Sequence, residues 1–200
     1  EIDFKEFFLY MFPVAISTFC FTALTSMDMV LVRYYFNPGE SGTYAVAQMA
    51  GKIFIFLPGA ISIVMFPKTS GLSAKQSDTT SILRRSIVYA AILCISAGLI
   101  YNLAPVFILK VLTGKALAES VFLGRLFSIS MSFFALLFIF INYFLSIKDL
   151  RFIKYLIIFS VLQALAIIFL HNNLIQIQWI LCLSGFSLFL IHWLLAKPKK

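Results

Sequence analysis

Two charged side chains lie deep inside apolar stretches of this sequence, and they are the residues best placed to do chemistry. Asp28 interrupts an apolar run over residues 7–36, and Lys52 interrupts a second one over residues 42–67. An ionised group at the centre of a bilayer costs at least about 2.5 kcal/mol, so such a group faces water, a ligand or an opposite charge. Asp28 is therefore a candidate coupling site for a proton or ion, and Lys52 is a candidate binding site for an anionic substrate.

Polar side chains recur beside Asp28 at helical spacing. Thr18, Thr22 and Thr25 stand at positions i, i+4 and i+7, which predicts that they share one helix face. Asp28 and Arg33 fall on the flanks of the same half of that helix. Thr22 and Thr25 could then offer hydrogen bonds to hydroxyl groups of a substrate, and Arg33 could offer a second positive charge.

The second apolar run has a polar face of its own. Tyr44, Gln48 and Lys52 repeat every four residues, and Gly59 continues the same face. The two helices together supply the candidate substrate-binding residues Lys52, Arg33, Gln48, Tyr44, Thr22 and Thr25. A third polar face is expected in residues 120–147, made of Arg125, Ser128, Ser132, Asn142, Tyr143 and Ser146.

The same residues also fit a purely structural interpretation. Ser and Thr side chains in membrane helices often bond to a carbonyl of their own helix or to a neighbouring helix. Asp28 could pair with Lys52 or with Arg33 and simply lock two helices together. Arg33 could instead extend its guanidinium group to the membrane surface.

Proline residues interrupt both polar helices. Pro13 lies early in the first apolar run, and Pro58 precedes Gly59 in the second. Because proline removes a backbone hydrogen bond and kinks a helix, we interpret Pro13, Pro58 and Gly59 as hinges between conformations or as part of a cavity wall. A static packing kink is the alternative for each proline.

The composition is that of a membrane protein. Of the 200 residues, 62% are hydrophobic and 12% are charged, against about 25% charged residues in a soluble domain. The 16 Lys and Arg residues outnumber the 8 Asp and Glu residues, and they gather in short clusters between apolar runs. That distribution indicates membrane topology and no nucleic-acid partner. Cys20, Cys94 and Cys182 each lie in an apolar run and are interpreted as small buried side chains.

Six apolar segments approach or exceed the length of about 20 residues that crosses a bilayer. The predicted spans are residues 7–36, 42–67, 86–109, 120–147, 152–170 and 176–196. They predict an all-α fold, in which residues 1–200 form one polytopic six-helix transmembrane bundle. The last two spans are separated by an expected turn at residues 171–173 that also includes Gln176 and Gln178.

The basic residues predict the orientation of the bundle. Most of them fall at one set of span ends, at Lys5, Lys68, Lys75, Arg84, Arg85, Lys148, Arg151, Lys154, Lys197, Lys199 and Lys200. Because cytoplasmic loops are enriched in Lys and Arg, both termini are expected in the cytoplasm, with the protein in the cytoplasmic membrane. The loop at residues 71–80 is then cytoplasmic, whereas a tight hairpin at 37–41 and a connection at 104–115 are external. Since the chain has neither an initiator Met nor a signal peptide, it is expected to be a fragment of a longer one.

The sequence offers no set of residues for enzymatic catalysis. Every acidic residue apart from Asp28 lies at a span end or in a loop, so no carboxylate pair is available at membrane depth. His171 and His192 lack metal-ligand spacing with a Cys or a carboxylate, and no phosphate-binding P-loop motif occurs. We therefore expect no enzymatic activity, no cofactor and no metal.

The residues around both charges also carry a family resemblance. The segments SMDMVLVRYYF (residues 26–36), GTYAVAQMAGKIFIFLPGAI (42–61) and FPKTS (66–70) resemble the start of the C-terminal half of polysaccharide biosynthesis proteins. These are oligosaccharide flippases of the multidrug/oligosaccharidyl-lipid/polysaccharide exporter superfamily. From residue 70 to the C-terminus only the pattern of spans is similar. The resemblance implies the second half of a transporter of twelve or more helices, without its N-terminal bundle.

The resemblance also implies a function. Family members move a lipid-linked oligosaccharide, carried on a polyprenyl pyrophosphate, across the cytoplasmic membrane by alternating access between two bundles, and the first two helices of this half line the path. The implied partners are that substrate, membrane lipids, the missing N-terminal bundle, and candidate polysaccharide polymerase and glycosyltransferase enzymes. Two alternatives stay open: an ion-coupled exporter of small molecules or drugs, and a non-transporting membrane scaffold of a polysaccharide assembly complex. A membrane glycosyltransferase fits least, because the carboxylate pair is lacking.

Overall fold

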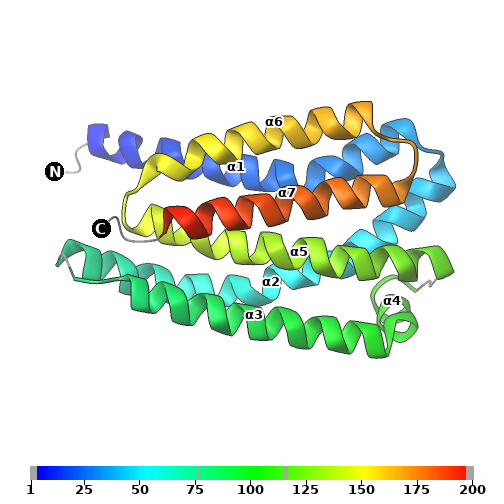
Figure 1. The fold of residues 1–200 in the computed structure, drawn as a ribbon, viewed down its shortest axis with the longest axis horizontal. Coiled ribbons are helices and arrows are strands. Elements are labelled where there is room, and N and C mark those ends of the chain that lie inside the picture. Colours follow the sequence, from blue (N-terminus) through cyan, green and yellow to red (C-terminus); the bar gives the residue numbers. More distant parts are fainter. Residues whose placement is uncertain (1–3, 76, 115–116, 197–200) are drawn as a thin grey trace.

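Long α-helices lie side by side along the longest axis of the molecule (Figure 1). The computed structural model describes residues 4–75, 77–114 and 117–196. The helices are α1 (Phe4–Tyr35), α2 (Pro38–Ala74), α3 (Thr80–Leu103), α4 (Pro105–Thr113), α5 (Ala118–Ser146), α6 (Ile153–Phe169) and α7 (Leu174–Leu195), with a 3-10 turn, η1 (Leu150–Phe152), before α6. No strand occurs in these ranges.

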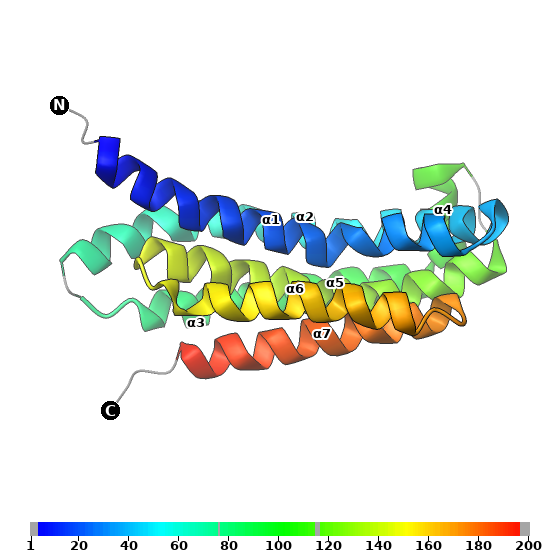
Figure 2. The same ribbon diagram turned by 90° about the horizontal axis from the view of Figure 1, so that it is seen from above.

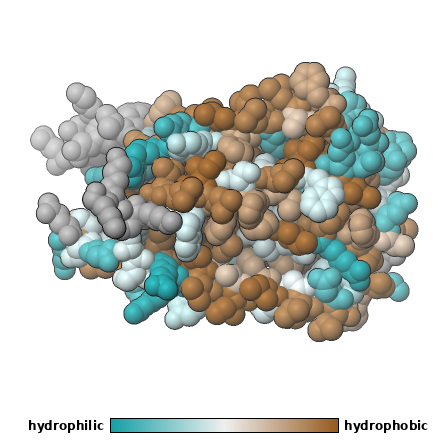
Figure 3. All heavy atoms as spheres, in the orientation of Figure 1, coloured by the Kyte–Doolittle hydropathy of each residue, from teal (hydrophilic) through white to brown (hydrophobic). Residues whose placement is uncertain are grey.

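Within the described ranges, six helices are long and apolar enough to cross a bilayer, namely α1, α2, α3, α5, α6 together with η1, and α7. α4 has 9 residues and is too short to cross. In Figure 3, apolar side chains cover the middle of the molecule, and polar side chains gather toward its ends. The predicted all-α fold is therefore confirmed, and the protein is a multi-pass membrane protein built as a six-helix bundle.

α5 is the central helix of the bundle. In its apolar stretch 61% of the residues are buried, against 22–35% in the other five spans. It packs against α2 and α7, while α1 packs mainly against α6, and α3 packs against both α2 and α5. The rings of Phe127, Phe134 and Phe140 on α5 are fully buried. They fill the space between the surrounding helices.

A glycine lets α2 approach α5 closely. A Cβ atom at Gly51 would lie 2.8 Å from the Cβ of Phe127 and 3.2 Å from the Cγ of Met131. Carbon atoms in contact are normally about 3.5–4.0 Å apart, so this position suits glycine. This close contact holds α2 against α5 at Gly51, the residue before Lys52. It thereby fixes the position of Lys52 along the long axis of the bundle.

A short hairpin at Phe36 and Asn37 joins α1 to α2. The side chain of Asn37 caps α2, because its Oδ1 accepts the backbone N–H of Glu40 at 2.9 Å and its Nδ2 donates to the Glu40 carboxylate at 2.8 Å. Pro38 begins the helix, at a position where a missing N–H is tolerated. The hairpin predicted over residues 37–41 is therefore shorter in the structure, because α2 already begins at Pro38.

The end of α2 and both ends of α3 also differ from the predicted ones. Residues 71–74 belong to α2 and not to the predicted loop, and α3 spans residues 80–103 in place of 86–109. Pro105 explains where α3 ends, because proline disfavours helical geometry at the residue before it and has no backbone N–H to continue the helix. Ala104 accordingly has φ −139° and ψ 55°. α4 then starts as a separate helix in the predicted external connection.

The turn between α6 and α7 lies where the sequence predicts it but is shorter. Asn173 caps α7 by accepting a backbone N–H of the first turn at 2.8 Å, and the ring of His171 stacks on Tyr35 with centroids 4.0 Å apart. Gln178, predicted to belong to this turn, lies inside α7, is buried, and donates to Oγ of Ser130 at 2.6 Å. That prediction was wrong, because α5 supplies the amide with a partner inside the bundle.

Proline lies inside both of the first two helices. Pro13 is within α1, and Pro58 and Pro67 are within α2. α1 is bowed, and its N-terminal part leans away from the other helices (Figure 2). A Cβ atom at Gly59 would meet no atom within 4 Å, so packing does not require glycine there. The assignment of Pro13, Pro58 and Gly59 as hinges stays a prediction.

Candidate functional site

The carboxylate of Asp28 is enclosed between α1 and α2 and is fully buried. The hydroxyl of Tyr44 donates to its Oδ2 at 2.8 Å. The amide Nε2 of Gln48 donates to Oδ2 at 2.9 Å and to Oδ1 at 3.0 Å. Both carboxylate oxygens therefore accept hydrogen bonds from neutral donors. Hydrogen bonds to a charged group contribute about 1.5–3 kcal/mol each, which offsets part of the cost of burying the charge.

The connection between the helices explains how these three residues meet. α1 and α2 run antiparallel from the hairpin at Asn37, so a residue before the hairpin faces one at a similar distance after it. Tyr44 and Gln48 are spaced i, i+4 on one face of α2, and both are buried. The ring of Tyr44 packs edge-on against Phe127 of α5, with centroids 5.0 Å apart. This contact holds the ring in place while its hydroxyl reaches Asp28.

Lys52 lies one turn beyond Gln48 on α2 and is half buried. Its ammonium group donates to Oγ of Ser26 on α1 at 3.4 Å, and no carboxylate among the described side chains lies within ion-pair distance of it. The structural alternative in which Asp28 pairs with Lys52 is therefore wrong. Asp28 takes its hydrogen bonds from Tyr44 and Gln48, and Lys52 lies beyond ion-pair distance of that carboxylate but near enough to interact with its charge.

Arg33 does not pair with Asp28 either. It is exposed in the last turn of α1, close to the hairpin. Over the side chains that the structure describes, the only ion pair joins Arg151 to Asp149, at 2.6 Å. The pairing of Asp28 with Arg33 considered from the sequence is thus wrong as well, and the charge of Arg33 lies at the hairpin end of the bundle.

The three threonines of α1 do not share one environment. Thr25 is buried, and its hydroxyl donates to the carbonyl of Phe21 at 2.9 Å, whereas Thr18 and Thr22 are exposed. α1 is one continuous helix over these residues, so the spacing that places the three threonines on one side of it is kept. Only Thr25 is buried, however, so a shared role of the three in substrate binding stays a prediction.

The polar residues of α5 serve contacts within and between helices. Ser128 and Ser132 donate to carbonyls of their own helix at 2.7 and 2.6 Å. Ser146 shares a hydrogen bond with a hydroxyl of α2 at 2.6 Å, and Tyr143 shares one with a hydroxyl just before α3 at 2.9 Å. The third polar face expected from the sequence therefore holds packing interactions and is not a wall of the site around Asp28.

A second buried polar cluster joins α1 to α6 and α7. Gln163 of α6 donates to the carbonyl of Leu24 at 2.8 Å, and Ser184 of α7 donates to Oε1 of Gln163 at 2.5 Å. Gln163 and Ser184 are each isolated polar side chains in an apolar span. The sequence therefore marks them as unusual but does not show that they contact each other. The cluster ties the helix that carries Asp28 to the C-terminal hairpin.

The described side chains contain no group of three or more His, Cys, Asp or Glu residues that could hold a metal ion. His192 is buried against rings of α5, including Phe140. Cys20 and Cys94 are buried free thiols, and Cys182 is partly exposed. These residues therefore contribute to helix packing, and the chemistry available at the site comes from Asp28, Lys52 and their neighbours.

No protein-family model, curated protein or solved structure matches this chain. The family resemblance of residues 26–70 therefore stays a prediction, and function has to be argued from the site. The site consists of a buried carboxylate held by two neutral donors, beside a half-buried lysine that forms no ion pair with a described side chain.

Proposed function

We propose that this chain forms half of a transporter that moves a lipid-linked oligosaccharide, a glycan carried on a polyprenyl pyrophosphate, across the cytoplasmic membrane. A second bundle, the N-terminal half expected from the sequence, supplies the opposite wall of the path, and the two halves open alternately to each side. Both termini of the bundle are cytoplasmic in this proposal, because most basic residues stand at that end. The chain itself carries out no enzymatic step.

The position of Lys52 is the observation that supports this proposal most. Lys52 lies within an apolar helix long enough to cross the membrane and is half buried. A cation at that depth costs at least about 2.5 kcal/mol unless water or a counter-charge meets it. A pyrophosphate group supplies such a counter-charge, and the attraction is stronger than in water because the effective dielectric constant of a partly dry site is lower.

Asp28 acts in this proposal as the coupling site. Tyr44 and Gln48 hold its carboxylate on the interface between α1 and α2, outside ion-pair distance of Lys52. A proton bound by Asp28 would remove a negative charge next to Lys52 and so increase the attraction of Lys52 for an anion. Protonation and substrate binding would therefore favour each other, as linkage between two sites requires.

The other predicted binding residues take different parts in the proposal. Tyr44 and Gln48 were candidate substrate-binding residues, but both donate to Asp28, so in this proposal they act by positioning that carboxylate. Thr22 and Arg33 are exposed on α1 and are free to contact the glycan. Thr25, whose hydroxyl bonds to its own helix, contributes to packing.

An ion-coupled exporter of small molecules is the second candidate function, and the burial of Asp28 favours it. A carboxylate held at membrane depth by neutral donors is a suitable proton site for a transport cycle. Cationic drugs, however, require an acid that they can reach, and Asp28 is fully buried.

A non-transporting scaffold is the third candidate, in which Asp28, Tyr44 and Gln48 serve only to join α1 to α2.

Replacing Lys52 with alanine in the intact protein tests the proposal. We expect surface polysaccharide to be lost while the protein stays in the membrane at its normal level, because the hydrogen bond of Lys52 to Ser26 is long, at 3.4 Å. Lys52→Arg keeps the charge and should retain part of the export. The matched control is Lys110→Ala, which removes an exposed charge from α4 and should leave export unchanged.

The outcomes separate the three candidate functions. Normal polysaccharide in the Lys52→Ala variant would contradict the flippase proposal. Altered drug resistance with normal polysaccharide would favour the exporter. Loss of folding stability in Asp28→Ala, with normal export from the fraction that folds, would favour the scaffold.

A further inference from the structure

A groove opens between α2 and α3 at the end of the bundle where these helices are joined. It has a volume of about 480 Å³, and its lining includes Ile61, Val64 and Lys68 from α2 with Arg85 and Tyr89 from α3. A second hollow, of about 660 Å³, adjoins it and shares Arg85 and Tyr89. These two side chains therefore lie where the two hollows meet.

The groove is apolar toward the middle of the bundle and basic toward its end. Ile61 and Val64 precede Lys68 along α2 by roughly 6–10 Å, at about 1.5 Å per residue. Arg85 follows soon after the start of α3 at Thr80, so it lies near the same end as Lys68. An anionic head group followed by a hydrocarbon chain matches this order of side chains.

The cations of this region form no ion pair with a described acidic side chain. Lys68, Arg84 and Arg85 are exposed, and none of them forms an ion pair with a described side chain. Arg84 and Arg85 also lie near the N-terminus of α3, where the positive end of the helix dipole disfavours cations. An anion placed among these groups would offset the repulsion between the neighbouring cations. It would also offset the unfavourable interaction of Arg84 and Arg85 with the dipole of α3.

Asp78 is the acid that lines the adjoining hollow. Its carboxylate accepts the backbone N–H of Thr80 at 2.9 Å and also the Thr80 hydroxyl. These hydrogen bonds hold the pKa of Asp78 below its ordinary value. Asp78 is therefore ionised at neutral pH, and its charge opposes the binding of an anion in the groove.

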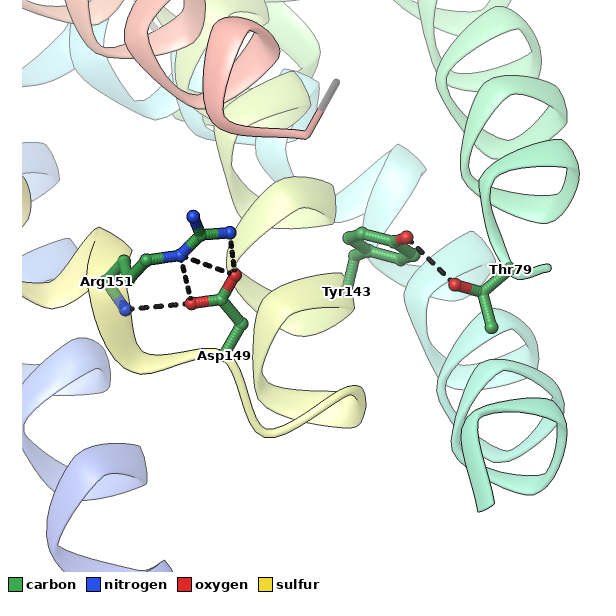
Figure 4. A network of polar contacts seen from close by, with 4 residues as sticks. All are labelled: Thr79, Tyr143, Asp149 and Arg151. Carbon is green, nitrogen blue, oxygen red and sulfur yellow. Dashed lines mark hydrogen bonds and ion pairs between the residues drawn. The ribbon is translucent and has the colours of Figure 1, made fainter. Parts of the chain in front are cut away.

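The start of α3 is anchored to the rest of the bundle. The buried hydroxyl of Thr79 shares a hydrogen bond of 2.9 Å with the hydroxyl of Tyr143 on α5 (Figure 4). The same view shows the carboxylate of Asp149 bonded to Arg151, so this acid is already paired. The hydrogen bond of Thr79 therefore anchors the start of α3, the helix that carries Arg84 and Arg85, to α5. Asp149 is paired with Arg151 and does not neutralise these two arginines.

We propose that this groove binds an anionic phospholipid of the surrounding membrane, with the phosphate between Lys68 and Arg85 and an acyl chain along Ile61 and Val64. Tyr89 has 60% of its surface exposed, which suits an aromatic residue at the boundary between hydrocarbon and head groups. The apolar half of the groove favours a lipid over a soluble phosphate, because an inorganic ion would leave that half empty.

Native mass spectrometry of the purified protein in detergent micelles tests this proposal, with phosphatidylglycerol or phosphatidylcholine added at equal concentration. We expect phosphatidylglycerol to stay bound and phosphatidylcholine to be released. The double substitution Lys68→Ala with Arg85→Ala should weaken phosphatidylglycerol binding by about fivefold for each basic residue removed. Both side chains are exposed, so the helices should still fold, which circular dichroism verifies.

Two further variants make the test specific. Arg33→Ala with Lys110→Ala removes the same charge from the opposite end of the bundle and should leave binding unchanged. Asp78→Asn keeps an oxygen to accept from Thr80 but removes a negative charge, so it should strengthen binding. Equal weakening by the two double substitutions would overturn the proposal, and so would displacement of phosphatidylglycerol by millimolar inorganic phosphate.

Discussion

Replacing Tyr44 with phenylalanine removes only the hydroxyl that donates to Oδ2 of Asp28 at 2.8 Å. The ring can keep its edge contact with Phe127, so the change isolates one hydrogen bond. Because Asp28 is fully buried and its carboxylate is a charged acceptor, we expect Tyr44→Phe to lower the free energy of unfolding by about 1.5–3 kcal/mol. Hydrogen bonds between neutral groups of membrane helices average about 0.6 kcal/mol. A loss of stability above that value therefore measures the effect of the negative charge on the acceptor.

Tyr143→Phe is the matched control. It also removes one phenolic hydroxyl, but the partner of that hydroxyl is the neutral side chain of Thr79, at 2.9 Å. We expect a cost of about 0.6 kcal/mol. Reversible unfolding of the purified variants in mixed lipid–detergent micelles measures both free energies. If Tyr44→Phe costs no more than Tyr143→Phe, the carboxylate of Asp28 is not a charged acceptor and the reasoning about this site fails.

A double-mutant cycle separates the hydrogen bond from any change in packing. Asp28→Asn removes the charge at nearly constant volume, and the double variant with Tyr44→Phe completes the cycle. Residues in direct contact in one hydrogen-bond network couple by about 0.5–3 kcal/mol, and we expect a value in the upper half of that range for Asp28 and Tyr44. A coupling energy near zero would show that the hydroxyl and the carboxylate contribute independently.

The remaining predictions concern glycines of α2. Gly51→Ala places a Cβ atom 2.8 Å from the Cβ of Phe127 and should lower the free energy of unfolding by about 1–3 kcal/mol through overpacking. Its control Gly42→Ala meets no atom within 4 Å and should be neutral or stabilising; the reverse order of stabilities would contradict the packing of α2 on α5. Gly59→Ala also meets no atom within 4 Å, so it should not destabilise the fold, but it should slow polysaccharide export if Gly59 is a hinge. Unchanged export would reject the hinge.

The number and course of the spans could be predicted from the sequence. Apolar runs of this length can satisfy their backbone groups in lipid only as helices or closed barrels, and these runs lack the alternation of barrel strands. Local turn residues such as Asn37 and Asn173 marked both short hairpins, because their side chains cap the helix that follows. The start of α3 was missed, since its first turns contain Arg84 and Arg85, and a helix that continues outside the hydrocarbon needs no apolar residues there.

Asp28 and Lys52 could be singled out from the sequence because an ionised group inside an apolar span is costly wherever its helix packs. Their partners could not. Periodicity shows which residues share a face of one helix. Which residues of a neighbouring helix that face contacts depends on how the neighbour is rotated about its axis and shifted along it. The hairpin at Asn37 and the close contact of Gly51 with α5 set that rotation and position, and so brought Tyr44 and Gln48 to Asp28. Lys52 was left without an ion pair to a described side chain.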